Sequence, residues 1–90
     1  MAPSIVASRA PGCAVLSWTE GSGRRTVVRA GRVCQGALDP ATVAQVSRAG
    51  VEAGDSELAT DGRNVFVVWQ ELPSARGARE ELRVARLACD

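Results

Sequence analysis

An internal repeat constrains the fold of this 90-residue chain more than any other feature of its sequence. Residues 13–20 (CAVLSWTE) align with residues 64–71 (NVFVVWQE), so that Trp69 follows its equivalent, Trp18, by 51 residues. Two further pairs of segments recur in the same order, at offsets of 52 and 54 residues: 3–8 with 55–60, and 28–33 with 82–87. A repeat of this length indicates an architecture in which each copy forms one supersecondary unit.

Each recurring segment has the composition of a β-strand. Residues 14–19 and 65–70 are apolar on both faces, which is typical of a strand buried between two sheets. The other expected strands flank these two in each repeat: 4–8 and 26–33, and 57–60 and 81–87. Asp61-Gly62, between two of the strands, is a strong hairpin signal. The sequence therefore predicts an all-β fold.

The linker between the repeats, residues 36–55, has two interpretations. Asp39 fits a helix N-cap, Pro40 the first helical position and Gly50 the residue past the end, which together indicate a short helix. The alternative is a fourth strand over residues 42–47, where apolar and polar residues partly alternate. Local signals favour the helix, but the repeat context favours the strand, and we expect the strand.

These segments, in their order and spacing, resemble the repeats of secreted bacterial β-propeller proteins, which have about fifty residues per blade. The resemblance rests on four short matches: Arg32-Val33, Leu38-Asp39-Pro40, Ala59-Thr60-Asp61-Gly62 and Val67-Val68-Trp69. It implies antiparallel four-stranded blade-like sheets, with residues 4–8 innermost and the linker strand outermost. Residues 1–90 would then form a single unit of roughly two blades, a first repeat at 3–54 and a second, incomplete repeat at 55–90.

The chain departs from that family in two respects. It lacks the Ser-x-Asp-x-Gly-x-x-Trp box of sialidase-type blades, so the resemblance does not imply sialidase chemistry. It also holds fewer than two blades, whereas propellers typically have 4–8. We therefore expect either the remaining blades of a parent protein or a ring that closes by homo-oligomerisation. The missing last strand of the second repeat would leave unpaired backbone at an edge, to which another chain can pair.

The residue inventory excludes several kinds of chemistry. Without histidine or lysine the chain cannot use Ser-His-Asp catalysis, histidine zinc ligands, a P-loop lysine or a Schiff base. No catalytic motif is present, and we expect no enzymatic activity, metal site or cofactor. Glu20 and Glu71 end equivalent strands, where they could bind a ligand at a rim or pair with arginine. Arg24 and Arg25 follow Gly21-Ser22-Gly23, which could bind a phosphate or form a plain hairpin turn. These four residues are the candidates for ligand binding.

Two tryptophans and three cysteines complete the candidate residues. Trp18 and Trp69 could stack on sugars, but their positions inside apolar strands favour core packing. If residues 13–20 and 26–34 form a hairpin, Cys13 lies opposite Cys34, at a separation that a disulfide can span. We predict this disulfide and a free Cys89; buried reduced thiols are the alternative.

Charge and hydropathy restrict the partners. The net charge is +1 and acidic residues are interleaved with the arginines, which argues against a nucleic-acid partner. No apolar run approaches the ~20 residues of a membrane span, and the N-terminus lacks the pattern of a signal peptide. The resemblance and the predicted disulfide favour an extracellular or periplasmic location.

The sequence thus suggests a non-catalytic β-propeller repeat module that serves as scaffold or recognition surface for a protein or glycan. The alternative is a fragment or self-assembling subunit of a glycan-binding or glycoside-hydrolase-like propeller. Both functional hypotheses depend on fold analogy.

Overall fold

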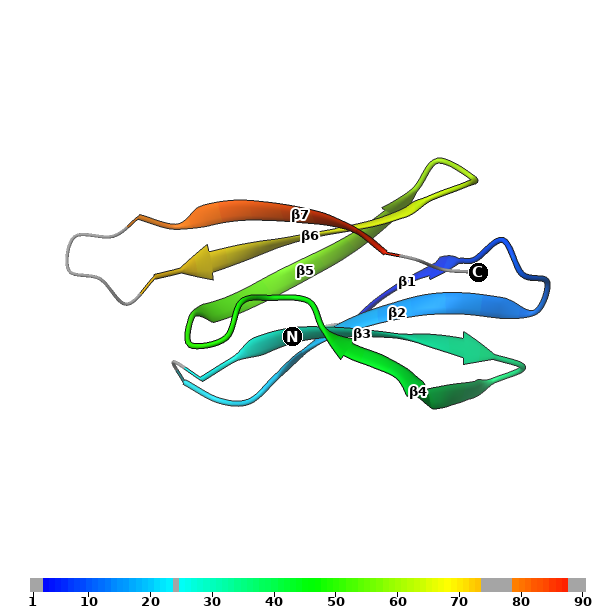
Figure 1. Ribbon diagram of the computed structural model, residues 1–90, viewed down its shortest axis with the longest axis horizontal. Coiled ribbons are helices and arrows are strands. Elements are labelled where there is room, and N and C mark those ends of the chain that lie inside the picture. The colour runs from blue at the N-terminus through cyan, green and yellow to red at the C-terminus, as the bar shows by residue number, and fades with distance from the viewer. Residues whose placement is uncertain (1–2, 24, 74–78, 88–90) are drawn as a thin grey trace.

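The computed structural model describes residues 3–23, 25–73 and 79–87, which form seven strands in two antiparallel sheets (Figure 1). Sheet A has the order β1-β2-β3-β4, and its strands are β1 (Ser4–Ala7), β2 (Cys13–Glu20), β3 (Val27–Cys34) and β4 (Ala37–Gln45). Sheet B has the order β5-β6-β7, and its strands are β5 (Glu52–Thr60), β6 (Val65–Leu72) and β7 (Glu81–Leu87). The predicted all-β class with antiparallel blade-like sheets is confirmed.

The β2–β3 hairpin has the register that the sequence predicted. Its pairs run from Cys13 opposite Cys34 to Glu20 opposite Val27. Gly21 opens the turn with a φ of +103°, and a Cβ there would collide with the carbonyl oxygen of the residue four positions later. Glycine is therefore required where this hairpin reverses direction.

The linker forms a strand, β4, and its helical interpretation is wrong. The Asp39 carboxylate accepts a hydrogen bond from the Ala41 amide (3.1 Å), and the Thr42 hydroxyl donates to the Asp39 carbonyl (2.7 Å). These local bonds make a turn within the strand rather than a helix N-cap. The same hydroxyl accepts a hydrogen bond from the Arg32 amide of β3 (2.8 Å), so the irregular stretch stays attached to the sheet. The strand begins five residues before the predicted range, 42–47.

Strand β5 extends further upstream than the expected range, 57–60. It starts at Glu52 and contains a bulge between Gly54 and Glu57, where Asp55 has a φ of +54°. The repeat alignment places residues 3–8 on 55–60, but the strand pairing differs from this alignment by one residue. Leu58 pairs with Val67, as Ile5 pairs with Leu16 in sheet A.

The two sheets bury opposite faces of the same repeat. Sheet B buries Val67 and Trp69, at 0% and 5% exposure, in a core that also contains Val28 of sheet A. Their equivalents in β2, Leu16 and Trp18, point to the outer side, because β2 buries its other face. The sheets are therefore stacked head to tail, unlike a two-fold sandwich, in which both copies would bury the same face.

The first strand of sheet B, β5, contacts the strands β1, β2 and β3 of sheet A. The Leu58 amide of β5 donates to the Ser4 hydroxyl of β1 (3.1 Å), and the buried hydroxyls of Ser17 and Ser56 lie 3.1 Å apart. In contrast, β4 and β7 lie at opposite outer edges of the molecule (Figure 1). Strand β5 is thus the strand of sheet B that makes most of the contacts with sheet A.

Candidate functional site

The most completely enclosed charged group of the described chain is Glu71, near the end of β6. Its side chain is 0% exposed. One carboxylate oxygen accepts hydrogen bonds from the Trp69 indole (2.8 Å) and the Arg48 amide (3.3 Å), and the other pairs with the Arg48 guanidinium (2.7 Å). Hydrogen bonds to an ionised carboxylate are stronger than those between neutral groups, so this cluster stabilises the interface between the sheets.

Arg48 reaches Glu71 because the connection between β4 and β5 is fixed on β3. The Val46 amide donates to the Val28 carbonyl (2.8 Å), and the Val28 amide donates to the Ser47 hydroxyl (2.9 Å). The connection crosses from the outer edge of sheet A to the first strand of sheet B (Figure 1). Repeat one therefore supplies the cation for the carboxylate of repeat two.

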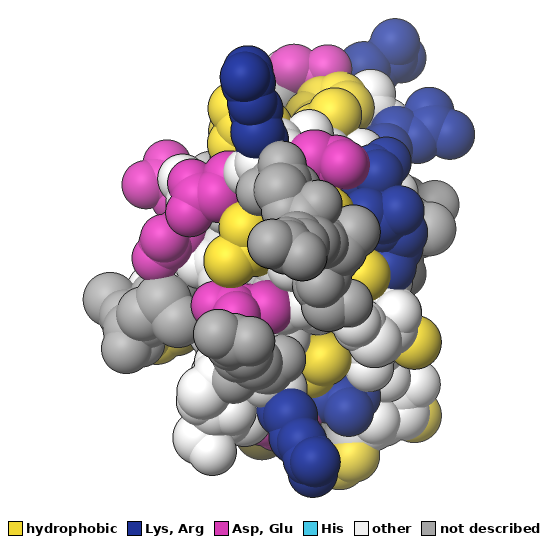
Figure 2. Space-filling view, turned by 90° about the vertical axis from the view of Figure 1, so that its left-hand side faces the viewer, with side chains coloured by type: hydrophobic (Ala, Val, Ile, Leu, Met, Phe, Trp, Pro, Cys, Tyr) yellow, Lys and Arg dark blue, Asp and Glu magenta, His cyan; other side chains and the backbone are white. Residues whose placement is uncertain are grey.

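A second arginine and a second carboxylate extend the cluster onto β7. The Arg83 Nε lies 3.6 Å from the Glu71 carboxylate, and the Arg83 guanidinium pairs with Glu81 at 2.7 Å. The buried Arg83 Nε has no hydrogen-bond partner in the described part of the chain, since the nearest Glu71 oxygen is 3.6 Å away. Figure 2 looks onto this end of the molecule, where acidic side chains lie mainly toward one side and arginines mainly toward the other.

The surroundings of Glu71 stabilise its ionised form. Burial on its own would raise the pKa of this carboxyl group. The hydrogen bonds from the Trp69 indole and from Arg48, together with the charge of Arg48, outweigh burial and hold the pKa of Glu71 below its usual value. Glu71 is consequently an anion in the folded protein at neutral pH.

Repeat one contains the same cluster without the fixed cation. The Trp18 indole donates to Glu20 (3.4 Å), and the Arg29 guanidinium pairs with Glu20 (2.6 Å). Arg29 lies opposite Trp18 on β3, as Arg83 lies opposite Trp69 on β7. The Glu20 side chain, however, is 54% exposed, since nothing in the described residues covers it as Arg48 covers Glu71.

Sequence reasoning found the two glutamates but missed the arginines that pair with them. Arg29 and Arg83 recur at the offset of the third repeated segment, so the alignment contained the signal for this part of the cluster. Arg48 lies in the linker, which has no counterpart in the alignment. Its contact could not be read from the sequence because it depends on how the two sheets stack.

The other candidates do not join either glutamate. Arg25 is exposed in the β2–β3 turn, where its amide donates to the Ser22 carbonyl (3.1 Å). Within residues 3–23, 25–73 and 79–87, no hydrogen bond or ion pair links Glu20 to Glu71 or to Arg25. Arg24 and Cys89 lie outside the described residues. The described residues also contain no group of three side chains that could hold a metal ion.

Cys13 and Cys34 form the predicted disulfide. Their Cα atoms are 4.1 Å apart, and the bond joins the start of β2 to the end of β3 across 21 residues. It therefore closes the end of the hairpin that lies opposite the Gly21 turn.

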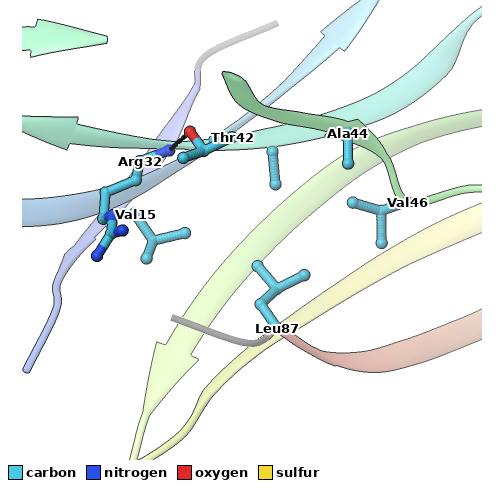
Figure 3. Close-up of a pocket in the computed structure, with 8 residues that line it drawn as sticks. Val15, Arg32, Thr42, Ala44, Val46 and Leu87 are labelled. Atoms are coloured by element: carbon cyan, nitrogen blue, oxygen red, sulfur yellow. Dashed lines mark hydrogen bonds between the residues drawn. The ribbon is translucent and has the colours of Figure 1, made fainter. Parts of the chain in front are cut away.

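A pocket of about 210 Å³ lies between the sheets (Figure 3). Most of its lining is apolar: Val15, Ala30, Gly31, Arg32, Thr42, Ala44, Val46 and Leu87. Its polar groups are already engaged, since the Arg32 amide donates to the Thr42 hydroxyl (2.8 Å) and Arg32 makes a further interaction. The lining therefore offers shape rather than convergent polar groups for a ligand.

The fold and the two clusters define a class of protein: an all-β chain of two repeated sheets stacked head to tail through a Trp-x-Glu cluster. No known protein family, curated protein or solved structure matches the chain significantly. No helix in the described ranges is long and apolar enough to cross a membrane.

Proposed function

We propose that this chain is a non-catalytic β-propeller repeat module that serves as scaffold or recognition surface in an extracytoplasmic protein. One observation carries the proposal: equivalent residues face opposite directions in the two sheets, with Trp69 buried and Trp18 outward. Stacking of this kind can be repeated. Each sheet has one face equivalent to the inner face of sheet A and one equivalent to the inner face of sheet B, so every new interface joins the same two kinds of face. Each blade of a propeller contacts its neighbours in this way.

The two outer faces support further stacking. Sheet B exposes Leu82 at 74% and Val84 at 69% on its outer face. Sheet A exposes Ile5 at 60% and Leu38 at 41% on the face that also carries Trp18. These faces are equivalent to the two halves of the interface inside the chain, so each fits a face of the other kind on a further repeat. Exposed apolar side chains gathered on a sheet are typical of an interaction surface.

The extracytoplasmic location rests on the disulfide. Disulfides persist in oxidising compartments and are rare in the cytosol. A small module with a modest core also gains more from such a cross-link than a large domain does.

Molar mass in solution, measured by size exclusion with light scattering over a range of concentrations, tests the proposal. We expect a discrete closed oligomer of the wild-type chain, which Val84→Glu converts to monomer because a charge enters the outer face of sheet B. Ser22→Glu adds the same charge in the exposed β2–β3 turn and should leave the oligomer intact. A wild-type chain that stays monomeric at every concentration would contradict stacking through these faces.

A further inference from the structure

We propose that the Trp18–Glu20–Arg29 cluster is the docking site for a further repeat of the repeat-one type, which places an arginine on Glu20 as Arg48 lies on Glu71. The inference rests on the proposed function, since it assumes that head-to-tail stacking continues on the outer face of sheet A. It goes beyond that function because it names the group that the partner must supply.

The two clusters share a tryptophan, a glutamate and an arginine, and they differ in the cation that repeat one adds to the second and in Glu81, which pairs with Arg83 (2.7 Å). In both, a tryptophan two residues before the glutamate donates its indole proton, and an arginine on the next strand faces the carboxylate. The carboxylate at Glu71 is fully enclosed, and its cation comes from the connection after β4. The exposed carboxylate at Glu20 pairs with Arg29 (2.6 Å) and has no cation from such a connection in the described residues.

Among the described residues, the backbone beside Glu20 is open as well. In sheet B the start of β5 pairs with the end of β6, with Ala53 opposite Glu71 and Glu52 opposite Leu72. In sheet A the pairing of β1 with β2 begins at Ser17, so on that side Trp18–Glu20 has no strand partner in the described residues. An exposed strand edge next to an exposed anion fits a segment that brings both a backbone to pair and a cation.

The connection of repeat one has both properties. Residues 46–54 carry Arg48 and continue into the paired start of β5. A second folded copy of this chain does not meet the requirement, because its own Arg48 already pairs with its own Glu71. The occupant that the site fits is therefore an additional repeat whose connection is free to lie on Glu20.

A tandem chain tests the inference: residues 1–55 of this protein followed directly by residues 3–90, so that an added repeat one precedes the original one and the strand register is kept. Hydrogen exchange reports the opening equilibrium of β2 in the original repeat. A double-mutant cycle combines Arg48→Gln in the added repeat with Glu20→Gln in the original repeat. We expect a coupling of about fivefold or more in that equilibrium constant. In the control, the same two substitutions are made in the 90-residue chain. Their effects on the opening equilibrium of β2 should be additive there.

The outcomes separate the inference from the proposed function. An added repeat with protected amides but additive substitutions would overturn the docking site and leave the head-to-tail stack standing. An added repeat whose amides exchange without protection would contradict the stack itself, and the inference with it. Protection of β2 together with coupling supports both.

Discussion

Trp18 and Trp69 show how one residue type takes two roles when a repeat is stacked head to tail. The sequence predicted both as core residues, which is right for Trp69, at 5% exposure, and wrong for Trp18, which is half-buried on the outer face. Their sequence surroundings are alike, so neither periodicity nor composition distinguishes them. The difference arises from which face the neighbouring sheet covers.

Alanine substitutions should reveal this difference. Trp69→Ala removes a buried indole and one of the hydrogen-bond donors to Glu71, so we expect a loss of about 3–5 kcal/mol in the free energy of unfolding. Trp18→Ala removes a half-exposed indole and should cost about 1 kcal/mol or less. Denaturant unfolding in the monomeric Val84→Glu background measures both, and equal losses would contradict the assigned faces.

Glu71 should make the stability of the protein sensitive to acid. Because its pKa is lower in the folded protein than its usual value of 4.5, its contribution is complete above that value and is lost as the pH falls through the folded pKa. Asp61, whose pKa is lowered by hydrogen bonds from the Asn64 and Arg63 amides, contributes in the same direction. Acid should therefore destabilise the protein through both groups.

Glu71→Gln should reduce this pH dependence without abolishing it. At neutral pH the substitution should cost about 2 kcal/mol, because hydrogen bonds to a charged acceptor are replaced by weaker ones. The matched substitution Glu20→Gln, at an exposed ion pair, should cost no more than about 0.5 kcal/mol. Urea titrations at a series of pH values measure these effects; an unchanged pH dependence in Glu71→Gln would contradict the role given to the cluster.

At the scale of the strands, the Cys13–Cys34 disulfide joins β2 and β3, which form the central hairpin of sheet A. A cross-link over 21 residues limits the unfolded chain, so we expect the double variant Cys13→Ser/Cys34→Ser to lose about 2–4 kcal/mol of stability. Denaturant unfolding of the wild-type protein after reduction is the control and should give a similar loss. A non-reducing peptide map in which both cysteines are free thiols, in protein kept oxidised, would refute the bond.

The elements differ in how far the sequence predicts them. Local patterns determine the hairpins. The apolar segments and the glycine turn predicted the register of β2 and β3, and Cys13 lies opposite Cys34 as expected. The linker was ambiguous because Asp39 and Pro40 suit a helix start and a strand turn equally well, and only pairing with β3 decides between them. The bulge at Asp55 was not predicted, since a positive φ at a non-glycine residue leaves little trace in composition.

At the scale of the whole molecule, the stacking of the two sheets explains the contacts that could not be predicted from the sequence. Arg48 binds Glu71 across the interface, and the first strands, β1 and β5, lie side by side, whereas β4 and β7 lie at opposite edges. Both outer faces then carry apolar residues that match the halves of the internal interface. These apolar faces support the proposal that further repeats stack on both sides of the molecule.

Contacts between methyl and aromatic groups in a nuclear Overhauser spectrum test the head-to-tail stack most directly. The chain has only three aromatic side chains, Trp18, Phe66 and Trp69, so their signals are readily distinguished. Val28 shares the core with Trp69, whereas Trp18 and Phe66 lie on the outer faces. We expect contacts from the Val28 methyl groups to the Trp69 indole and none to the other two rings. Contacts from Val28 to Phe66 in place of Trp69 would mean that sheet B buries its other face, and the account would be wrong.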